Sequence, residues 1–350
     1  MAVIETDAVV VGAGPVGLFQ VFQLGLQGIR CQVIDSLPEP GGQCVQLYPD
    51  KPIYDIPAVP VCSGRQLCEL LLRQIEPFRA GFHLDQEVSR LQRRDDGRFD
   101  VSSSRGLAFV ARTVFIAGGV GSFQPRRIKL AALDAYEGSQ LFYRAGDAAS
   151  FAGQRVVVAG GDAEAVDSAI ALAEPGPQAA AGVTLLHRRA VLDAPPDRLA
   201  RLQALVDAGA LAFVVGQPVG IVEAGGRLAG LELIDPDSKP ATLALDRVLV
   251  RLGLAPKLGP IAAWGLALER KQLVVDTARF ETGTPGIFAV GDVNTYPGKR
   301  KLIVSGFHEA TLAAFAAAAI VFPDQPVQLQ YTTTSPTLQR RLGVATSAPD

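Results

Sequence analysis

The sequence predicts an α/β protein built from two Rossmann-like dinucleotide-binding domains, and two observations carry this prediction. A short β-branched run, a tight glycine turn and a helix-compatible stretch follow one another twice, at residues 8–17 and 156–165. A further strand-like run comes after each of them, at 31–35 and 182–187. The order strand, turn, helix, strand is the βαβ unit, which forms a parallel sheet. Each unit is therefore expected to build a domain of its own.

Length and composition agree with two domains. The chain has 350 residues, and domains average roughly 150 residues. Because 48% of the residues are hydrophobic, the chain can bury a sizeable core. The formal net charge of −2 argues against a general nucleic-acid binder, whose affinity depends on excess basic charge. We expect no nucleic-acid partner.

No secretion signal or membrane span is expected either. The first residues run directly into an apolar strand and lack the basic stretch and cleavage site of a signal peptide. The most apolar stretch, 302–322, contains His308 and Glu309. Its uninterrupted part, 310–322, is shorter than the ~18–20 residues that cross a bilayer. We expect a buried, alanine-rich helix there, in a cytoplasmic protein.

The first glycine motif has the form of a dinucleotide fingerprint. Gly12 permits the turn, Gly14 lets a pyrophosphate approach the backbone, and Gly17 lets helix and strand pack closely. Pro15 lies inside the motif, at the expected helix start. Asp35 comes 18 residues after Gly17, at the end of the next strand, and is placed to accept hydrogen bonds from ribose hydroxyls. The alternative is a glycine-rich turn in an ordinary α/β domain.

Two apolar strands that end in glycine mark the points where the chain leaves each βαβ domain. They lie at 114–119 and 248–253. The simplest assembly is one domain interrupted by another. We expect the first domain to comprise residues 1–120 and 283–350, and the second to comprise 121–282.

A third apolar strand suggests which dinucleotide the first domain binds. The segment 284–292 is a buried-type strand that ends in Asp292. It resembles the second FAD motif of two-dinucleotide-binding flavoproteins, in which the aspartate binds the ribityl–phosphate part of the flavin. Asp292 would otherwise be a helix N-cap, and the two roles are compatible.

More specific motifs extend along nearly the whole chain. They are PGGQC at 40–44, LYPDKPIYDIP at 47–57, LGPI at 258–261, WGL at 264–266, YPGK at 296–299, LIVSGF at 302–307 and QYTTTS at 330–335. In this order the chain resembles the thioredoxin-reductase-like ferredoxin/flavodoxin–NADP reductases.

The resemblance implies an FAD-containing homodimer that passes electrons between NADPH and ferredoxin or flavodoxin. It also implies a set of residues that contact FAD: Asp35, Gln43, Tyr48, Val88, Phe123, Asp292 and Thr333. Tyr48 and Tyr331 occupy positions whose side chains stack on the isoalloxazine, with the C-terminal tail lying over the flavin. We assign no general acid or base, because the cofactor supplies the chemistry.

The cysteines argue against a dithiol relay. The four cysteines are Cys31, Cys44, Cys62 and Cys68, and no two of them are in C-x-x-C spacing. Nothing in their spacing suggests a metal site or a disulfide framework. Thioredoxin reductases carry a redox C-x-x-C in the NADPH domain, whereas the corresponding stretch here, 142–147, has no cysteine. Electrons are therefore expected to leave the flavin directly.

The second glycine motif is expected to bind NADP(H). Gly160 and Gly161 form its turn. By resemblance, His187, Arg188 and Arg189 hold the 2′-phosphate, for which the arginine guanidinium is a suitable partner. The alternative for the two arginines is a solvated strand end.

Two acids depart from the family pattern in this second motif. Asp162 aligns with Gly14 of the first motif, where the pyrophosphate approaches. Asp193 stands where the family usually has a second arginine. Carboxylates near phosphates repel them, so we expect a recognisable but weakened NADPH site.

Three basic clusters are expected to attract an acidic ferredoxin or flavodoxin. The alternative is that they are ordinary solvated surface. They lie at 126–129, 299–301 and 340–341. Two other functions stay open: another NADPH-dependent flavin or quinone reductase on the same scaffold, and a flavin-binding paralogue with impaired NADPH turnover.

Overall fold

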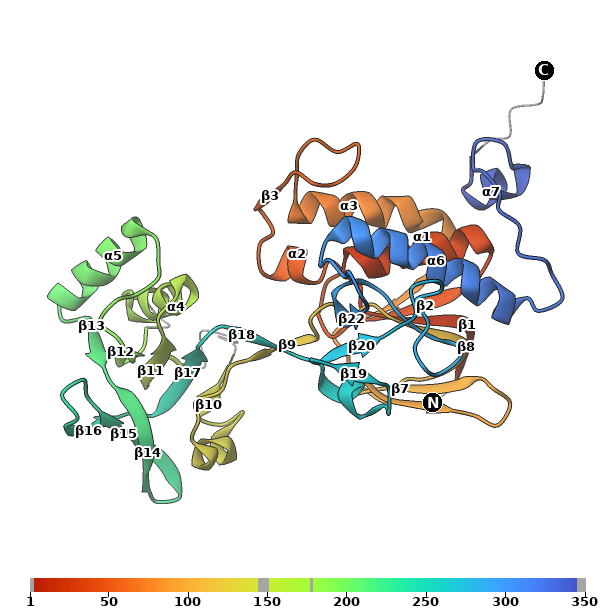
Figure 1. Cartoon of the computed structure of the whole chain (residues 1–350). Helices are drawn as coiled ribbons and strands as arrows, with labels where there is room; N and C mark the ends of the chain where they lie inside the picture. The colour runs from red at the N-terminus through yellow and green to blue at the C-terminus, as the bar shows by residue number, and fades with distance from the viewer. Residues whose placement is uncertain (1–2, 144–150, 177–178, 345–350) are drawn as a thin grey trace. The chain divides into compact units, whose positions relative to one another are not determined.

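The computed structural model describes residues 3–143, 151–176 and 179–344, except for the side chains of 122–124 and 254–257. The chain divides into two compact units, each held together by contacts among its own residues (Figure 1). The first unit is Met1–Ser122 with Pro256–Asp350, and the second is Phe123–Ala255. Each is treated separately below.

A seven-stranded sheet forms the centre of the first unit, in the order β5-β2-β1-β8-β7-β6, with β21 also paired to β8. The strands are β1 (Ile4–Val11), β2 (Cys31–Ile34), β5 (Gly81–His83), β6 (Val88–Arg93), β7 (Phe99–Ser103), β8 (Ala108–Ile116) and β21 (Ile287–Ala289). The pairs β5–β2, β2–β1, β1–β8 and β8–β21 are parallel, whereas β6, β7 and β8 are antiparallel neighbours. The parallel strands are almost continuously apolar, as expected for strands buried on both faces.

Three helices lie side by side on one face of this sheet (Figure 1): α1 (Pro15–Gln27), α3 (Gly64–Ile75) and α6 (Ile303–Val321). By length and composition, α6 could cross a membrane. In the fold, however, its alanine-rich side is buried, and the ring of Phe307 lies 4.5 Å from that of Phe19 on α1. The alanine-rich segment is thus a buried core helix, as its sequence predicted.

Smaller elements complete the first unit. They are α2 (Gln43–Gln46), β3 (Pro52–Ile53), β4 (Cys62–Ser63), η1 (Glu76–Phe78), η4 (Gly259–Ala263), β19 (Leu268–Glu269), β20 (Gln272–Val274), η5 (Gly291–Val293), β22 (Asn294–Thr295) and α7 (Pro336–Arg341).

The contacts return to the first unit earlier in the chain than the expected boundary at residue 283. Ile261, Leu273 and Phe280 are buried in the core of the first unit, so the segment before 283 belongs to it by packing. The expected boundary lies just before β21, which joins the sheet after the chain has already returned to the first unit.

The second unit has a five-stranded parallel sheet in the order β10-β17-β11-β12-β13. Its strands are β10 (Leu141–Phe142), β11 (Arg155–Gly160), β12 (Gly182–His187), β13 (Leu211–Val215) and β17 (Arg247–Arg251). The remaining elements are η2 (Ala131–Tyr136), α4 (Ala163–Ala173), α5 (Pro196–Asp207) and the antiparallel strands β14 (Gln217–Ala224), β15 (Arg227–Ile234) and β16 (Pro240–Ala244). The strands β9 (Ser122–Pro125) and β18 (Leu254–Lys257), where the chain passes from one unit to the other, pair with each other.

Candidate functional site

The parallel strands of the first unit end in register, which brings four loops to one edge of the sheet. Val11 pairs with both Ile34 and Ile116, and Ile116 pairs with Ala289. Ligands of open α/β sheets bind at this carboxyl edge. The loops that follow these strands are therefore the candidate site of the first unit.

Two glycines of the first turn are required by packing. Gly12 has a φ of +111°, and a Cβ there would overlap the carbonyl oxygen of Ala117. A Cβ on Gly17 would overlap the carbonyl oxygen of Gly12. The turn could not close with side chains at either position.

Gly14 is different, because the fold itself leaves room for a side chain there. Its φ of −69° suits any residue, and nothing in the described chain lies closer than 3.9 Å to a Cβ placed on it. The helix α1 starts at Pro15, and no side chain of the described chain caps its N-terminus. The open space and the uncapped helix end form a cradle that fits an anionic phosphate group.

Gly41 and Gly42 form the other wall of this cradle. The N–H of Gly41 donates to the carbonyl oxygen of Ala13 at 2.8 Å, and a Cβ on Gly42 would lie 3.0 Å from the Cα of Gly14. Gln43 begins α2 directly after them, and its side-chain Nε2 lies beside Gly119, just past the end of β8. The PGGQC segment is thus packed onto the first glycine turn.

Asp35 connects the end of β2 to the same turn. Its carboxylate accepts hydrogen bonds from the N–H of Ala13 at 2.5 Å and of Leu37 at 2.8 Å. Burial raises the pKa of Asp35, and these two N–H groups oppose the rise. The buried carboxylate therefore organises the turn, and each of its oxygens keeps a further acceptor position for a ligand.

Asp292 reaches the same edge from the far end of the chain. Gly291, with a φ of +79°, lies against Val16, and a Cβ on Gly306 of α6 would overlap a Val16 methyl group. The negative charge of Asp292 contributes to raising the pKa of Tyr48. Asp292 lies inside the η5 turn, whose N-cap is Val290, so the helix N-cap alternative is wrong.

Tyr48 and two cysteines lie together on this side of the unit. The thiol of Cys68 donates to the carbonyl oxygen of Gly41 at 3.7 Å. Cys44 lies close enough to Tyr48 and Cys68 for the three groups to shift one another's pKa. Burial and the neighbouring thiol raise the pKa of Tyr48 to about 12. All four cysteines are free and buried in the described chain. Cys62 and Cys68 are the closest pair along the sequence, but in the fold the thiol of Cys68 lies beside that of Cys44, with no disulfide between them.

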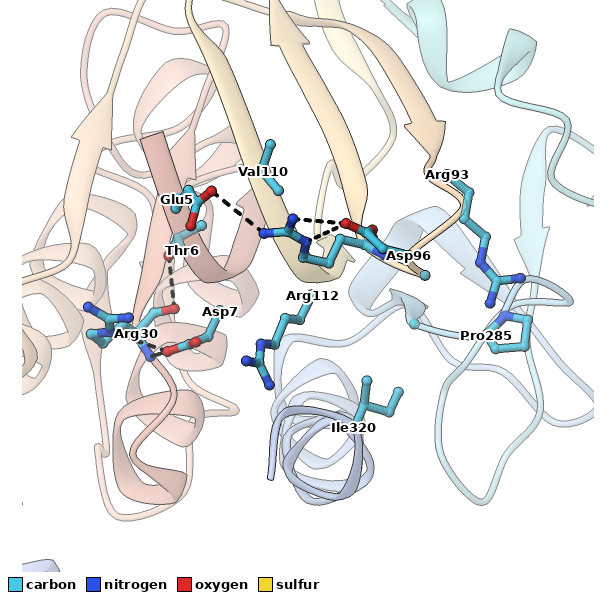
Figure 2. A pocket seen from close by; sticks show the side chains of 13 residues that line it. Glu5, Thr6, Asp7, Arg30, Arg93, Asp96, Val110, Arg112, Pro285 and Ile320 are labelled. Carbon is cyan, nitrogen blue, oxygen red and sulfur yellow. Dashed lines mark hydrogen bonds and ion pairs between the residues drawn. The ribbon is translucent and has the colours of Figure 1, made fainter. Parts of the chain in front are cut away.

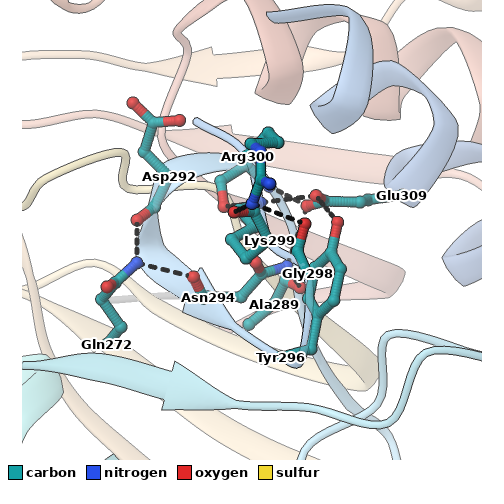
Figure 3. Close-up of polar contacts among 10 residues, drawn as sticks. Gln272, Ala289, Asp292, Asn294, Tyr296, Gly298, Lys299, Arg300 and Glu309 are labelled. Carbon is teal, nitrogen blue, oxygen red and sulfur yellow. Dashed lines mark hydrogen bonds and ion pairs between the residues drawn. The ribbon is translucent and has the colours of Figure 1, made fainter. Parts of the chain in front are cut away.

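A buried carboxylate that the sequence analysis assigned no role supports Asp292 (Figure 3). Glu309 of α6 accepts hydrogen bonds from the N–H of Gly291 at 2.7 Å, from Asn294 Nδ2 at 2.8 Å and from the Tyr296 hydroxyl at 2.9 Å. It also pairs with Lys299. A lone acid in an apolar helix is the signal that could have revealed this network, because a fully buried Glu is almost always paired.

This network corrects the interpretation of one basic cluster. The side chain of Lys299 is only 7% exposed and is committed to Glu309, so it is not part of the basic surface. Arg300 and Lys301 remain exposed.

The other residues expected to contact the flavin have side chains that are buried in the core, exposed to solvent or outside the described residues. Val88 is buried at the first position of β6, so only its backbone could face a ligand. The side chain of Phe123 lies outside the described residues. Tyr331 is 64% exposed, Thr333 is also exposed, and the described residues contain no ring contact between Tyr331 and Tyr48.

The anchoring of the C-terminal segment explains this exposure. The guanidinium of Arg341 in α7 donates to the carbonyl oxygen of Leu26, near the C-terminus of α1. The glycine turn is at the opposite end of this 13-residue helix, about 20 Å away at about 1.5 Å per residue. Within one chain, the tail is thus fastened away from the cradle.

The second unit repeats the turn with one difference. A Cβ on Gly160 would overlap the carbonyl oxygen of Arg251, and one on Gly161 would overlap the ring of His187. The N-cap of α4 is Asp162, whose carboxylate accepts a hydrogen bond from the N–H of Ala165 at 3.0 Å. Asp162 therefore occupies the position of Gly14, as the alignment predicted, and its own carboxylate fills the helix end.

Other charged groups surround this second turn. The N–H of Asp193 donates to the carbonyl oxygen of Gly161 at 2.7 Å, which brings Asp193 beside Asp162. Arg188 and Arg189 are exposed just after His187. Burial lowers the pKa of His187, and the two arginines lower it further, so the neutral ring is favoured. The expected basic triplet and the two unusual acids thus lie at one edge of the sheet.

A separate pocket of about 590 Å³ opens at the amino end of β1 (Figure 2). Arg30 there pairs with Asp7, and Arg98 pairs with Asp96. Arg112 donates to the carbonyl oxygen of Val321. Because β1 begins at this pocket and ends at the glycine turn, the pocket is not part of the candidate site.

Comparisons with known proteins agree with this arrangement. The family model of the pyridine nucleotide-disulphide oxidoreductases matches residues 6–316. A ferredoxin–NADP reductase of Methylibium petroleiphilum is 56% identical, over 99% of this chain and 95% of its own. One of Paracidovorax citrulli is 58% identical, over 98% of this chain and 97% of its own.

Solved structures share the fold at low identity. A thioredoxin reductase from Gloeobacter violaceus has a TM-score of 0.57 at 21% identity, covering 94% of this chain and 98% of its own. A bacillithiol disulfide reductase from Staphylococcus aureus has a TM-score of 0.58 at 16% identity, covering 92% and 100%. The chain therefore belongs to the pyridine nucleotide-disulphide oxidoreductase family, in the group formed by the ferredoxin–NADP reductases that match almost its whole length.

Proposed function

We propose that the protein is an FAD-dependent ferredoxin–NADP reductase, which transfers electrons between NADPH and a one-electron carrier protein. The observation that carries this proposal is the 56% identity to a ferredoxin–NADP reductase over 99% of the chain. Two glycine turns, each at the carboxyl end of the parallel strands of its own sheet, support it, because a flavoprotein reductase of this kind needs one dinucleotide site in each domain.

The residues of the first unit fit FAD. The uncapped start of α1 beside Gly14 would hold the pyrophosphate, Asp35 would accept a ribose hydroxyl, and Asp292 would bind the ribityl–phosphate region. Tyr48 and Gln43 lie on the same side and would contact the ring end. These residues would hold and orient the flavin, which would supply hydride-accepting and one-electron-donating chemistry.

The second unit would hold NADPH through Gly160 and Gly161, with Arg188 and Arg189 on the 2′-phosphate. The carboxylate of Asp162 lies at the helix end where the pyrophosphate would bind. Both groups are negatively charged, so Asp162 would repel the nucleotide. This observation favours one alternative: a flavin-binding paralogue with impaired NADPH turnover.

The route of the electrons follows from the cysteines. All four precede residue 69, so residues 123–255 contain no thiol, and a dithiol relay in the second unit is excluded by sequence. The electrons would pass directly to ferredoxin or flavodoxin. Exposed Arg126, Arg300 and Lys301 would attract such an acidic partner.

We also propose a cytoplasmic homodimer. Free, buried thiols are consistent with a reducing compartment. The exposed tail around Tyr331 is available to a second copy of the chain, which would allow Tyr331 to cover the partner's flavin although it lies away from Tyr48 in its own chain.

The test combines cofactor analysis with stopped-flow mixing. Purified protein should be yellow, and heat extraction should release FAD. NADPH should bleach the flavin, and adding ferredoxin should restore its colour faster than adding a quinone. Folded protein that takes up no added FAD rejects the flavin site. Bound FAD that NADPH does not bleach favours the impaired paralogue, and faster recovery with quinone favours a quinone reductase.

Tyr331 provides a separate prediction. Tyr331→Ser should expose one face of the flavin, shift its absorption spectrum and speed the reaction of the reduced flavin with oxygen, because an aromatic cover excludes water and oxygen. Tyr54→Ser is the matched control, since Tyr54 is similarly exposed, at 70% against 64% for Tyr331, and has no proposed role. Spectra and reoxidation rates that match the wild type would show that the tail does not cover the flavin.

A further inference from the structure

We propose that Glu309 is a positioning residue for the flavin. Together with the buried Lys299, it fixes the turn that carries Gly291 and Asp292, and this charge pair sets the electrostatic field at the cofactor. The inference rests on the proposed flavin site in the first unit.

Four donors converge on the Glu309 carboxylate from a single segment, residues 291–299. Oε2 accepts from the N–H of Gly291 and from Asn294 Nδ2, and Oε1 accepts from the Tyr296 hydroxyl and Lys299 Nζ. A carboxylate offers about four acceptor positions. All of them are used here, so the ionised side chain is a template around which the segment folds.

Lys299 closes the arrangement from the other side. Its Nζ also donates to the carbonyl oxygen of Gly291 at 2.8 Å and lies 5.2 Å from the centroid of the Tyr296 ring. Gly291 is thus held at its N–H by Glu309 and at its carbonyl oxygen by Lys299. Because Gly291 directly precedes Asp292, this double contact fixes the direction in which Asp292 points.

Further contacts hold the remainder of the turn (Figure 3). Gln272 donates to the carbonyl oxygens of Asp292 at 3.2 Å and Asn294 at 2.8 Å. Asn294 Nδ2 donates to the carbonyl oxygen of Ala289 at 2.7 Å. The turn therefore joins β20 and β21 to Glu309 of α6 as one hydrogen-bonded block.

The burial of the pair argues for a role beyond stability. Glu309 is 0% exposed and Lys299 is 7% exposed. Well-packed apolar residues often replace a buried ion pair without loss of stability, so stability alone does not require these charges. Burial raises the pKa of Asp292. The positive charges of Lys299 and Lys301 oppose this rise and the charge of Glu309 adds to it, so both members of the pair lie within electrostatic reach of the proposed flavin-binding carboxylate.

The charges predict opposite effects on the flavin potential. Glu309→Gln leaves the cation of Lys299 uncompensated, which stabilises the more negative, reduced flavin and raises its midpoint potential. Lys299→Met leaves the anion of Glu309 uncompensated and lowers the potential. A merely structural defect would move both variants in the same direction.

The experiment titrates flavin-free protein with FAD and measures the midpoint potential of each loaded variant. Glu309→Gln and Lys299→Met should each weaken FAD binding by about tenfold or more, because each leaves a buried partner unpaired. The double variant should recover part of this loss. Glu309→Asp should be milder than Glu309→Gln, and Lys271→Met is the control for removing an exposed lysine from the same unit.

The outcomes separate this inference from the proposed function. Wild-type protein that takes up no FAD rejects the flavin site itself. If the wild type binds FAD, potentials that shift in the same direction in both variants, or unchanged FAD affinities, overturn the positioning role. Should Glu309→Gln fail to fold, Glu309→Asp and Lys299→Arg carry the comparison: the positioning role requires the shorter acid to weaken FAD binding measurably more than the charge-preserving lysine replacement.

Discussion

Replacing Gly14 by Asp should give a folded protein that no longer takes up flavin. The backbone of Gly14 suits any residue, and a Cβ there has no neighbour within 3.9 Å in the described chain, so the fold should tolerate the change. The new carboxylate would cap α1 as Asp162 caps α4. It would occupy the helix end that the pyrophosphate needs and would repel its charge.

The expected loss of FAD affinity is large. Charge-assisted hydrogen bonds to a phosphate contribute about 1.5–3 kcal/mol each, and the helix end contributes up to about 2 kcal/mol. Losing roughly 3 kcal/mol in total weakens binding more than a hundredfold. Helix stability should change by only about a few tenths of a kcal/mol, because Gly and Asp are both accepted as N-caps.

Two variants control this experiment, which is read by FAD titration and urea unfolding of the flavin-free protein. Gly14→Asn adds the same cap without the charge and should give an intermediate loss of affinity. Gly17→Ala should instead destabilise the flavin-free protein by about 1–3 kcal/mol, because its Cβ overlaps the carbonyl oxygen of Gly12. A yellow Gly14→Asp protein with wild-type FAD affinity would mean that the cradle does not hold the cofactor.

Local patterns predicted much of the fold. The two strand–glycine–helix segments determine the parallel sheets because their periodicity and turn chemistry act over a few residues. The α/β fold class is confirmed by the solved structures, and the family resemblance is confirmed by the family match and by the ferredoxin–NADP reductases. The alignment of Asp162 with Gly14 also follows from local sequence, since both residues precede the first turn of a helix.

Contacts between distant segments were harder to predict. In the sequence, Lys299 belongs to a run of three basic residues, which predicts an exposed surface. Its partner Glu309 lies in the following helix, and only packing brings the two side chains together. Cys44 and Cys68 are separated by 24 positions and become neighbours only when α2 packs on α3. The position of Tyr331 depends on where the C-terminal tail is anchored. Arg341 anchors the tail at the C-terminal end of α1, far from the glycine turn.

Replacing Asp193 by Arg should tighten NADPH binding, with a smaller gain for NADH. Asp193 is exposed beside the second glycine turn, on the same edge as Arg188 and Arg189. A guanidinium there would gain a charge-assisted contact to the 2′-phosphate, which only NADPH carries. Such a contact contributes about 1–3 kcal/mol, or roughly tenfold or more in the dissociation constant.

Asp162→Asn separates this effect from the charge at the helix end. Asparagine keeps the cap on the N–H of Ala165 but removes the negative charge, so α4 should remain as stable as before. Because both nucleotides carry the pyrophosphate, the affinities for NADPH and NADH should rise equally, by about 1 kcal/mol or roughly fivefold.

Asp193→Asn removes repulsion without adding a contact, so its NADPH affinity should lie between those of the wild type and Asp193→Arg. Titrating each variant with both nucleotides measures these gains directly. If neither change improves either affinity, or the wild type already binds NADPH tightly, the two acids do not weaken the site.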